Sequence, residues 1–167
     1  MSKVEFQDFS VQVKDALEDA VTAYLYEAAG ELEAQTVRNS RQGKRYRGKM
    51  ATALWKHEVD EDKQIATIGS THEEAYWEEL GTGEYALNKD GRKGWWVYVE
   101  GNDSPSSNQK YYTEKEAKQT AAFMRSQGLD AHATNGIEPN RPLHRAFVGM
   151  KASLIRRAEE VLKGRLD

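Results

Sequence analysis

The sequence predicts an α+β fold, in which an antiparallel β-sheet is packed by a long N-terminal and a long C-terminal helix and carries a small inserted helix-strand segment. Amphipathic stretches at both ends of the chain predict the helices. Short stretches rich in β-branched and aromatic residues between them predict the strands. A chain of 167 residues suits one domain, residues 1–167, with residues 101–135 as an insertion within it.

The first helix is predicted over residues 9–37. Apolar residues such as Leu17, Val21, Leu25 and Leu32 recur there at three- and four-residue spacing, and charged residues fill other positions. A helix of this length runs about 40 Å, longer than most helices of globular domains. Part of its apolar stripe is therefore expected to meet another subunit.

A basic segment follows at residues 38–49. It contains no acidic residue, two glycines, and the basic residues Arg38, Arg41, Lys44, Arg45, Arg47 and Lys49. We expect a mobile loop with three possible roles. It lines a channel and contacts DNA or the negatively charged mouth of a connector, it docks on an acidic patch of a neighbouring protein, or it is a solvated surface loop.

A β-hairpin is predicted next, with strands over residues 50–59 and 64–70 and a polar turn at residues 60–63. A short helix is then expected over residues 73–80, with Tyr76, Trp77 and Leu80 on one face. Gly81 stands where a C-cap glycine belongs. The helix should therefore end in the tight turn Gly81-Thr82-Gly83.

Further along the chain, the sequence predicts a strand over residues 95–100, pairing with residues 110–112. Thr113 and Glu116 form a capping box for a helix that ends near residue 127, before Gly128. A return strand over residues 129–134 and an Asn135-Gly136 turn follow.

The final helix is predicted to start at Pro142, where proline's missing amide costs no hydrogen bond. Its apolar stripe, from Leu143 to Leu162, is as regular as that of the first helix.

Composition argues against several classes of protein. The chain is 38% hydrophobic and 31% charged with a mean hydropathy of -0.83, and no apolar run approaches a membrane span. The absence of cysteine excludes disulfides and thiolate metal sites. A net charge of only -3 argues against a dedicated nucleic-acid binder.

The sequence offers no constellation typical of catalysis. His57, His72, His132 and His144 lack the His-x-x-x-His spacing of a helical zinc site. No serine has the context of a nucleophile elbow, and Gly81-Thr82-Gly83 lacks the lysine of a phosphate loop. We therefore expect no enzyme, no catalytic or metal-binding residues and no cofactor.

Three stretches, read together, resemble the tail-component or neck-protein family of siphoviruses, the gene-product-ten type, related in role to lambda minor tail protein Z. Residues 75–83 (AYWEELGTG) match the family's aromatic, acidic and glycine positions. Residues 139–147 (PNRPLHRAF) are similar to its proline-rich start of a C-terminal helix. Residues 47–55 (RGKMATALW) correspond to its basic strand, with Arg47 in place of the usual threonine.

The resemblance implies a structural virion protein, found in the neck or tail and in the host cytoplasm during assembly. It implies homo-oligomeric rings, hexameric or dodecameric, that join the head connector or stopper to tail terminator or tube proteins, without a membrane. DNA passing through the channel is a further candidate partner. The alternatives are a tail-tube terminator of the same virion, or a small nucleic-acid-binding module that uses residues 38–49 and Trp55.

Candidate interface residues follow from the basic segment, the glycine-containing motif and the aromatic side chains outside the helix stripes. Each tryptophan has two interpretations, a core residue or an anchor of a subunit contact. The full set is Arg38, Arg41, Lys44, Arg45, Arg47, Trp77, Glu78, Gly81, Thr82, Gly83, Trp95 and Trp96.

Overall fold

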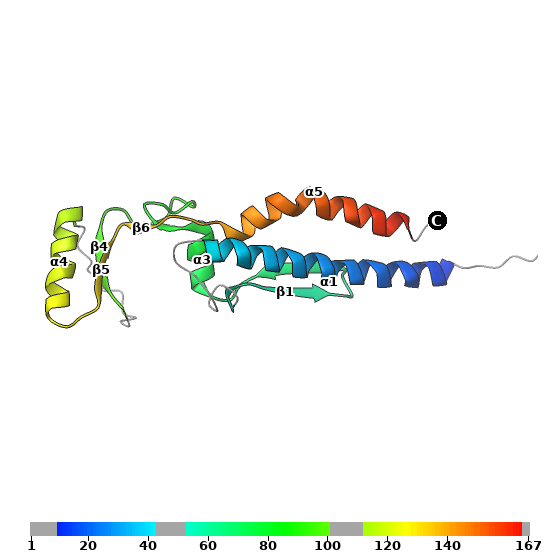
Figure 1. Ribbon diagram of the computed structural model, residues 1–167, viewed down its shortest axis with the longest axis horizontal. Coiled ribbons are helices and arrows are strands. Elements are labelled where there is room, and N and C mark those ends of the chain that lie inside the picture. The colour runs from blue at the N-terminus through cyan, green and yellow to red at the C-terminus, as the bar shows by residue number, and fades with distance from the viewer. Residues whose placement is uncertain (1–9, 43–52, 101–111, 165–167) are drawn as a thin grey trace, which may run out of the picture. The chain divides into compact units, whose positions relative to one another are not determined.

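The computed structural model describes residues 10–42, 53–100 and 112–164 (Figure 1). Its helices are α1 (Ser10–Gln42), α3 (Glu73–Leu80), α4 (Glu114–Ser126) and α5 (Pro142–Lys163). Its strands are β1 (Lys56–Asp60), β2 (Ile65–Gly69), β3 (Thr82–Gly83), β4 (Trp96–Val99), β5 (Ala131–Thr134) and β6 (Gly136–Ile137). The α+β class is confirmed. Within the described ranges the strands pair antiparallel as predicted, but as three separate two-stranded ladders, β1-β2, β3-β6 and β4-β5, and not as one sheet.

The chain divides into two compact units. Residues 1–71 and 142–167 form the first, called here the helical unit, and residues 72–141 form the second, called the central unit. The segment 101–135, predicted as an insertion, falls inside the central unit. No helix within the described ranges combines the length and the hydropathy needed to cross a bilayer.

Helices α1 and α5 lie side by side and form the body of the helical unit (Figure 1). Their buried residues are mostly small, which lets two helices approach closely. These residues include Ala20, Ala29, Thr36, Ser40 and Ala146. Pro142, fully buried at the first position of α5, accepts a hydrogen bond from Asn39 Nδ2 at 3.0 Å, while Arg145 donates to the Asn39 carbonyl at 3.0 Å.

Helix α1 continues five residues beyond the predicted end, so Arg38 and Arg41 are helical and the prediction of a loop there was wrong. Arg38 donates two hydrogen bonds to the Gln35 side chain one turn earlier, at 2.8 and 3.1 Å. Buried Val37 and Ser40 give the extension its inner face. Helix-forming arginines and the absence of glycine between residues 38 and 42 favour this outcome. Lys44, Arg45 and Arg47 lie outside the described residues.

The predicted β-hairpin is confirmed, with register from Lys56↔Gly69 to Asp60↔Ile65. Of the predicted first strand, residues 50–52 lie outside the described residues, Ala53 and Leu54 are helical, and the strand starts at Lys56. Leu54 and Trp55 are both 3% exposed and belong to the core. The hairpin lies against α1.

The helix α4 covers one face of the β4-β5 ladder in the central unit. Ala117, Ala121 and Ala131 are at most 1% exposed, so helix and ladder approach closely. The predicted capping box is present: Thr113 accepts from the Glu116 amide and Glu116 accepts from the Thr113 amide. Of the predicted pairing between residues 95–100 and 110–112, the described residues show the bridge Trp95↔Tyr112, while β4 pairs with β5; residues 110 and 111 lie outside the described residues.

Candidate functional site

The motif singled out by the sequence, Glu78 with Gly81-Thr82-Gly83, forms the centre of a closely packed cluster in the central unit. Glu78 lies on α3 and is only 4% exposed. Its Oε1 accepts a hydrogen bond from Asn140 Nδ2 at 2.8 Å, and its carbonyl accepts from the amides of Asn140 at 2.8 Å and Arg141 at 3.2 Å. Glu78 therefore fastens the chain segment that precedes α5 to α3.

The buried face of α3 differs from the predicted one. Ala75 and Glu78 are buried, whereas Tyr76 is 52% and Trp77 37% exposed. A carboxylate that is satisfied by Asn140 can be buried at moderate cost, and an amphipathic pattern does not predict this. Trp77 is thus an exposed aromatic on this unit, as an interface anchor would be.

The glycines of the motif allow the backbones of β3 and β6 to come close. Gly81 and Gly83 have positive φ angles of 73° and 62°. A Cβ on Gly83 would lie 2.2 Å from the Asn135 carbonyl oxygen, and one on Gly81 would lie 2.7 Å from that of Ile137. Thr82 Oγ1 accepts from the Ile137 amide at 3.0 Å. The motif thus holds the backbones of β3 and β6 together.

Two tryptophans of the predicted set lie next to cations. The Arg92 guanidinium is 5.0 Å from the ring centroid of Trp96, and the Lys118 ammonium is 5.7 Å from that of Trp95. Trp96 also borders Gly83, since a Cβ there would meet its ring at 2.7 Å. Trp95 and Trp96 are each partly buried. They combine a packing role with a partly accessible face.

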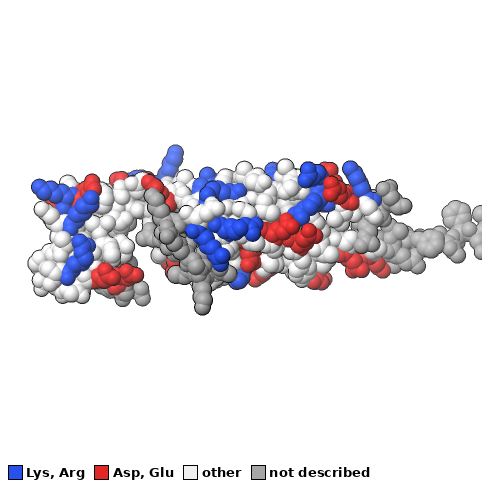
Figure 2. Space-filling model, in the orientation of Figure 1, with Lys and Arg blue, Asp and Glu red and all other residues white. Residues whose placement is uncertain are grey.

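The cationic residues Arg38 and Arg41 belong to the helical unit and are exposed on the last turns of α1. Figure 2 shows acidic and basic side chains interspersed over this unit, with no broad field of one sign on the visible face. Trp55, which the nucleic-acid alternative requires for base stacking, is buried in the core. It cannot stack on a base.

Ion pairs link the two long helices. Arg157 of α5 makes a bidentate contact with Glu31 of α1, at 2.9 and 2.5 Å, and reaches Glu27 at 3.1 Å. These hydrogen bonds hold the pKa of Glu31 below its ordinary value and raise that of Arg157. Tyr24 donates to the Leu154 carbonyl on the same interface, and burial raises its pKa.

The opposite face of α5 carries exposed apolar side chains. Val148, Ile155 and Leu162 are each at least 40% exposed. The predicted apolar stripe of α5 therefore has two parts. One part packs against α1, and the other is exposed. Sequence periodicity showed the stripe, but the division required knowledge of where α1 lies.

A cluster of side chains of the types that bind metal ions lies at the end of the β4-β5 ladder. The sequence did not suggest this cluster. His132 Nε2 is 2.9 Å from Asp130 Oδ1 and 3.7 Å from Glu100 Oε2. The strand register brings them together, since the Glu100 amide donates to the Asp130 carbonyl at 2.8 Å. A prediction that residues 95–100 pair with residues 129–134 would have identified this cluster. Both carboxylates are exposed, and such groups commonly occur without an ion.

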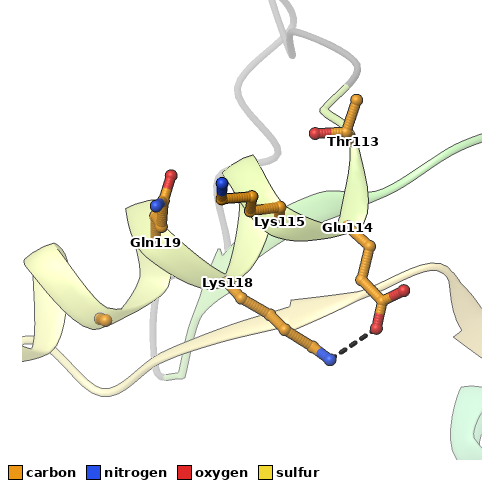
Figure 3. Close-up of a pocket in the computed structure, with 6 residues that line it drawn as sticks. Thr113, Glu114, Lys115, Lys118 and Gln119 are labelled. Atoms are coloured by element: carbon orange, nitrogen blue, oxygen red, sulfur yellow. Dashed lines mark hydrogen bonds and ion pairs between the residues drawn. The ribbon is translucent and has the colours of Figure 1, made fainter.

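A shallow pocket on the first turns of α4 is lined by Thr113, Glu114, Lys115, Lys118, Gln119 and Ala122. Figure 3 shows Lys118 and Glu114 pointing toward one another, joined by an ion pair of 2.5 Å. Glu114, Lys115 and Lys118 are all exposed, so the charged groups of the lining are in contact with solvent.

Comparison with protein-family models, with curated protein sequences and with solved structures gives no match for this chain.

Proposed function

We propose that this chain is a structural subunit of a long-tailed bacteriophage, which joins the head connector to the tail by associating with copies of itself and with neighbouring virion proteins. It makes and breaks no covalent bond. The proposal rests first on the resemblance of residues 47–55, 75–83 and 139–147 to neck proteins, in that order along the chain.

The observation that carries the proposal is the apolar outer face of α5. A helix whose inner face already packs on α1 gains nothing in its own fold from further exposed apolar residues. Exposed apolar rows of this kind mark surfaces that bind another protein. Exposed Trp77 on the central unit adds a possible aromatic anchor.

The motif of residues 78–83 fits an assembly role and not a chemical one. Its carboxylate is engaged by Asn140, and its glycines accommodate neighbouring backbone. It holds the backbone of the central unit in place. The exposed residues of that unit would form the contacts with other subunits.

The position of the protein in purified particles tests the proposal. Mass spectrometry of virions should detect this chain in multiple copies, and cryo-electron microscopy should place it as a ring at the head-tail junction. Placement at the end of the tail tube would favour the terminator role. Absence of the chain from infectious virions would refute the proposal.

A nucleic-acid-binding module is the second candidate, favoured by exposed Arg38 and Arg41 at the end of α1. Phosphate contacts weaken steeply with salt. The electrophoretic mobility shift of a DNA duplex at low ionic strength tests whether the chain binds nucleic acid. Binding that is lost in the Arg38→Gln/Arg41→Gln variant supports this role, and no shift removes it.

A further inference from the structure

The outer face of α5 carries an apolar row with a seven-residue repeat. Val148, Ile155 and Leu162 are 61%, 50% and 40% exposed. Seven residues make nearly two helical turns, so the three side chains line up along one edge of the helix. A seam between two packed helices repeats apolar residues at two positions of every seven, and this row occupies one of the two.

The row faces away from α1. The inner face of α5 is fixed by Tyr24, which donates to the Leu154 carbonyl, and by Glu31, which accepts from Arg157. Residues Ala146 and Leu154 on that side are buried or half-buried. The row at Ile155 is therefore open to another molecule.

Charges next to the row are arranged symmetrically about Ile155. Lys151 lies four residues before it and Glu159 four residues after it, and both are exposed. Four residues are about 40° more than a full turn, so the two charges border the row on opposite sides. The Lys151 ammonium lies 6.0 Å from the ring of Phe147, and Glu159 has no ion-pair partner among the described residues.

We propose that α5 pairs with α5 of a second copy, antiparallel, about a two-fold axis that passes at Ile155. Ile155 then meets its own counterpart, and Val148 meets Leu162 of the partner subunit. Lys151 meets Glu159 of the partner subunit, and symmetry makes this ion pair twice. The inference deepens the proposed function by naming one surface through which copies associate.

Charge complementarity selects this partner and this direction. A parallel pair in register would place Lys151 beside Lys151 of the partner subunit, and Glu159 beside Glu159 of the partner subunit. Both contacts are repulsive. The antiparallel pair turns the same four charges into two attractive contacts. Among these four charges, α5 is therefore complementary to itself in the antiparallel direction only.

The contact is small. A helix of 22 residues is about 33 Å long, and one helix pair lies at the lower end of the range of specific interfaces. The dimer is accordingly weak and forms in a concentration-dependent way. An isologous contact also closes with two copies, so a ring requires a further surface on the same chain.

Charge reversal tests the pairing. Sedimentation velocity of the full chain, over about 1–200 µM, should show a dimer for the wild type. Lys151→Glu alone, or Glu159→Lys alone, creates two like-charge contacts and should weaken the dimer by roughly tenfold or more. The double variant restores opposite charges in exchanged positions and should dimerise as the wild type does.

Two controls separate the seam from general charge effects. Lys115→Glu, an exposed lysine on α4, changes the net charge as Lys151→Glu does and should leave dimerisation unchanged. Ile155→Arg should abolish it while circular dichroism and melting temperature stay near those of the wild type. A wild type that stays monomeric throughout, or single variants that dimerise normally, would overturn the pairing.

The two proposals fail separately. If the chain is absent from virions but dimerises with this charge pattern, the neck role fails and the pairing stands. If the chain lies in the neck but Lys151→Glu neither weakens the dimer nor reduces the yield of joined particles, the pairing fails and the role stands.

Discussion

Asn140 holds Glu78 at both ends, because its backbone amide donates to the Glu78 carbonyl and its side-chain amide donates to the Glu78 carboxylate, each at 2.8 Å. The two residues are 62 positions apart in the chain. The pair therefore closes the central unit near the point where the chain leaves it toward α5.

Replacing Glu78 with alanine should destabilise the central unit by about 0.5–1.5 kcal/mol, since the part-buried Asn140 side-chain amide loses its hydrogen bond to Glu78. Glu78→Gln keeps a carbonyl oxygen at that position and should cost less. Hydrogen exchange read by mass spectrometry can assign the loss to residues 72–141. Equal stability of the alanine variant and the wild type would show that the contact contributes nothing.

Gly83→Ala should destabilise the central unit more than Gly128→Ala does. Both glycines have positive φ angles, so each substitution carries a strain of about 1–2 kcal/mol. Only Gly83 lacks space, because its Cβ would lie 2.2 Å from Asn135 O, whereas Gly128 has nothing within 4 Å. Thermal denaturation of the two variants makes the comparison. A Gly83→Ala melting temperature equal to that of Gly128→Ala would contradict the close contact.

Acid should weaken the α1-α5 pairing through Glu31. Arg157 lowers the pKa of Glu31 in the folded chain below its ordinary value of 4.5, so the stabilisation is present above that value. It is lost as the pH falls through the lowered pKa. The difference in stability between wild type and Glu31→Gln should therefore shrink in acid. Urea unfolding at pH 7 and near pH 3 measures it, and a difference that grows in acid would have the wrong sign.

Thr113→Ala should destabilise α4 by about 1 kcal/mol, because the first turn loses an acceptor for the Glu116 amide. Thr113→Ser retains the hydroxyl and serves as the control. Amide exchange in the first turn of α4 should accelerate in the alanine variant only. Equal exchange in both variants would exclude a stabilising role for the cap.

Local signals predicted much of the fold. The capping box at Thr113 and Glu116, the proline start of α5 and the glycine end of α3 depend on residues close in sequence, and each is present. The polar turn of the first hairpin was found for the same reason. These features are set by backbone hydrogen bonding within a few residues.

What the sequence did not show depends on contacts between distant residues. The end of α1 around Arg38 and Arg41 is joined to α5 through Asn39, which bonds to Pro142 and Arg145, more than 100 positions away. Glu78 is buried because Asn140 reaches it, and Trp55 is a core residue beside the basic segment. Glu100 and His132 meet through a strand pairing that periodicity did not predict.

Deletion of the gene that encodes this chain tests the proposed joining role most directly. Electron microscopy of lysates should then show filled heads and separate tails, and a plasmid copy of the gene should restore joined particles. Normal tailed, infectious particles in the absence of the protein would contradict the account.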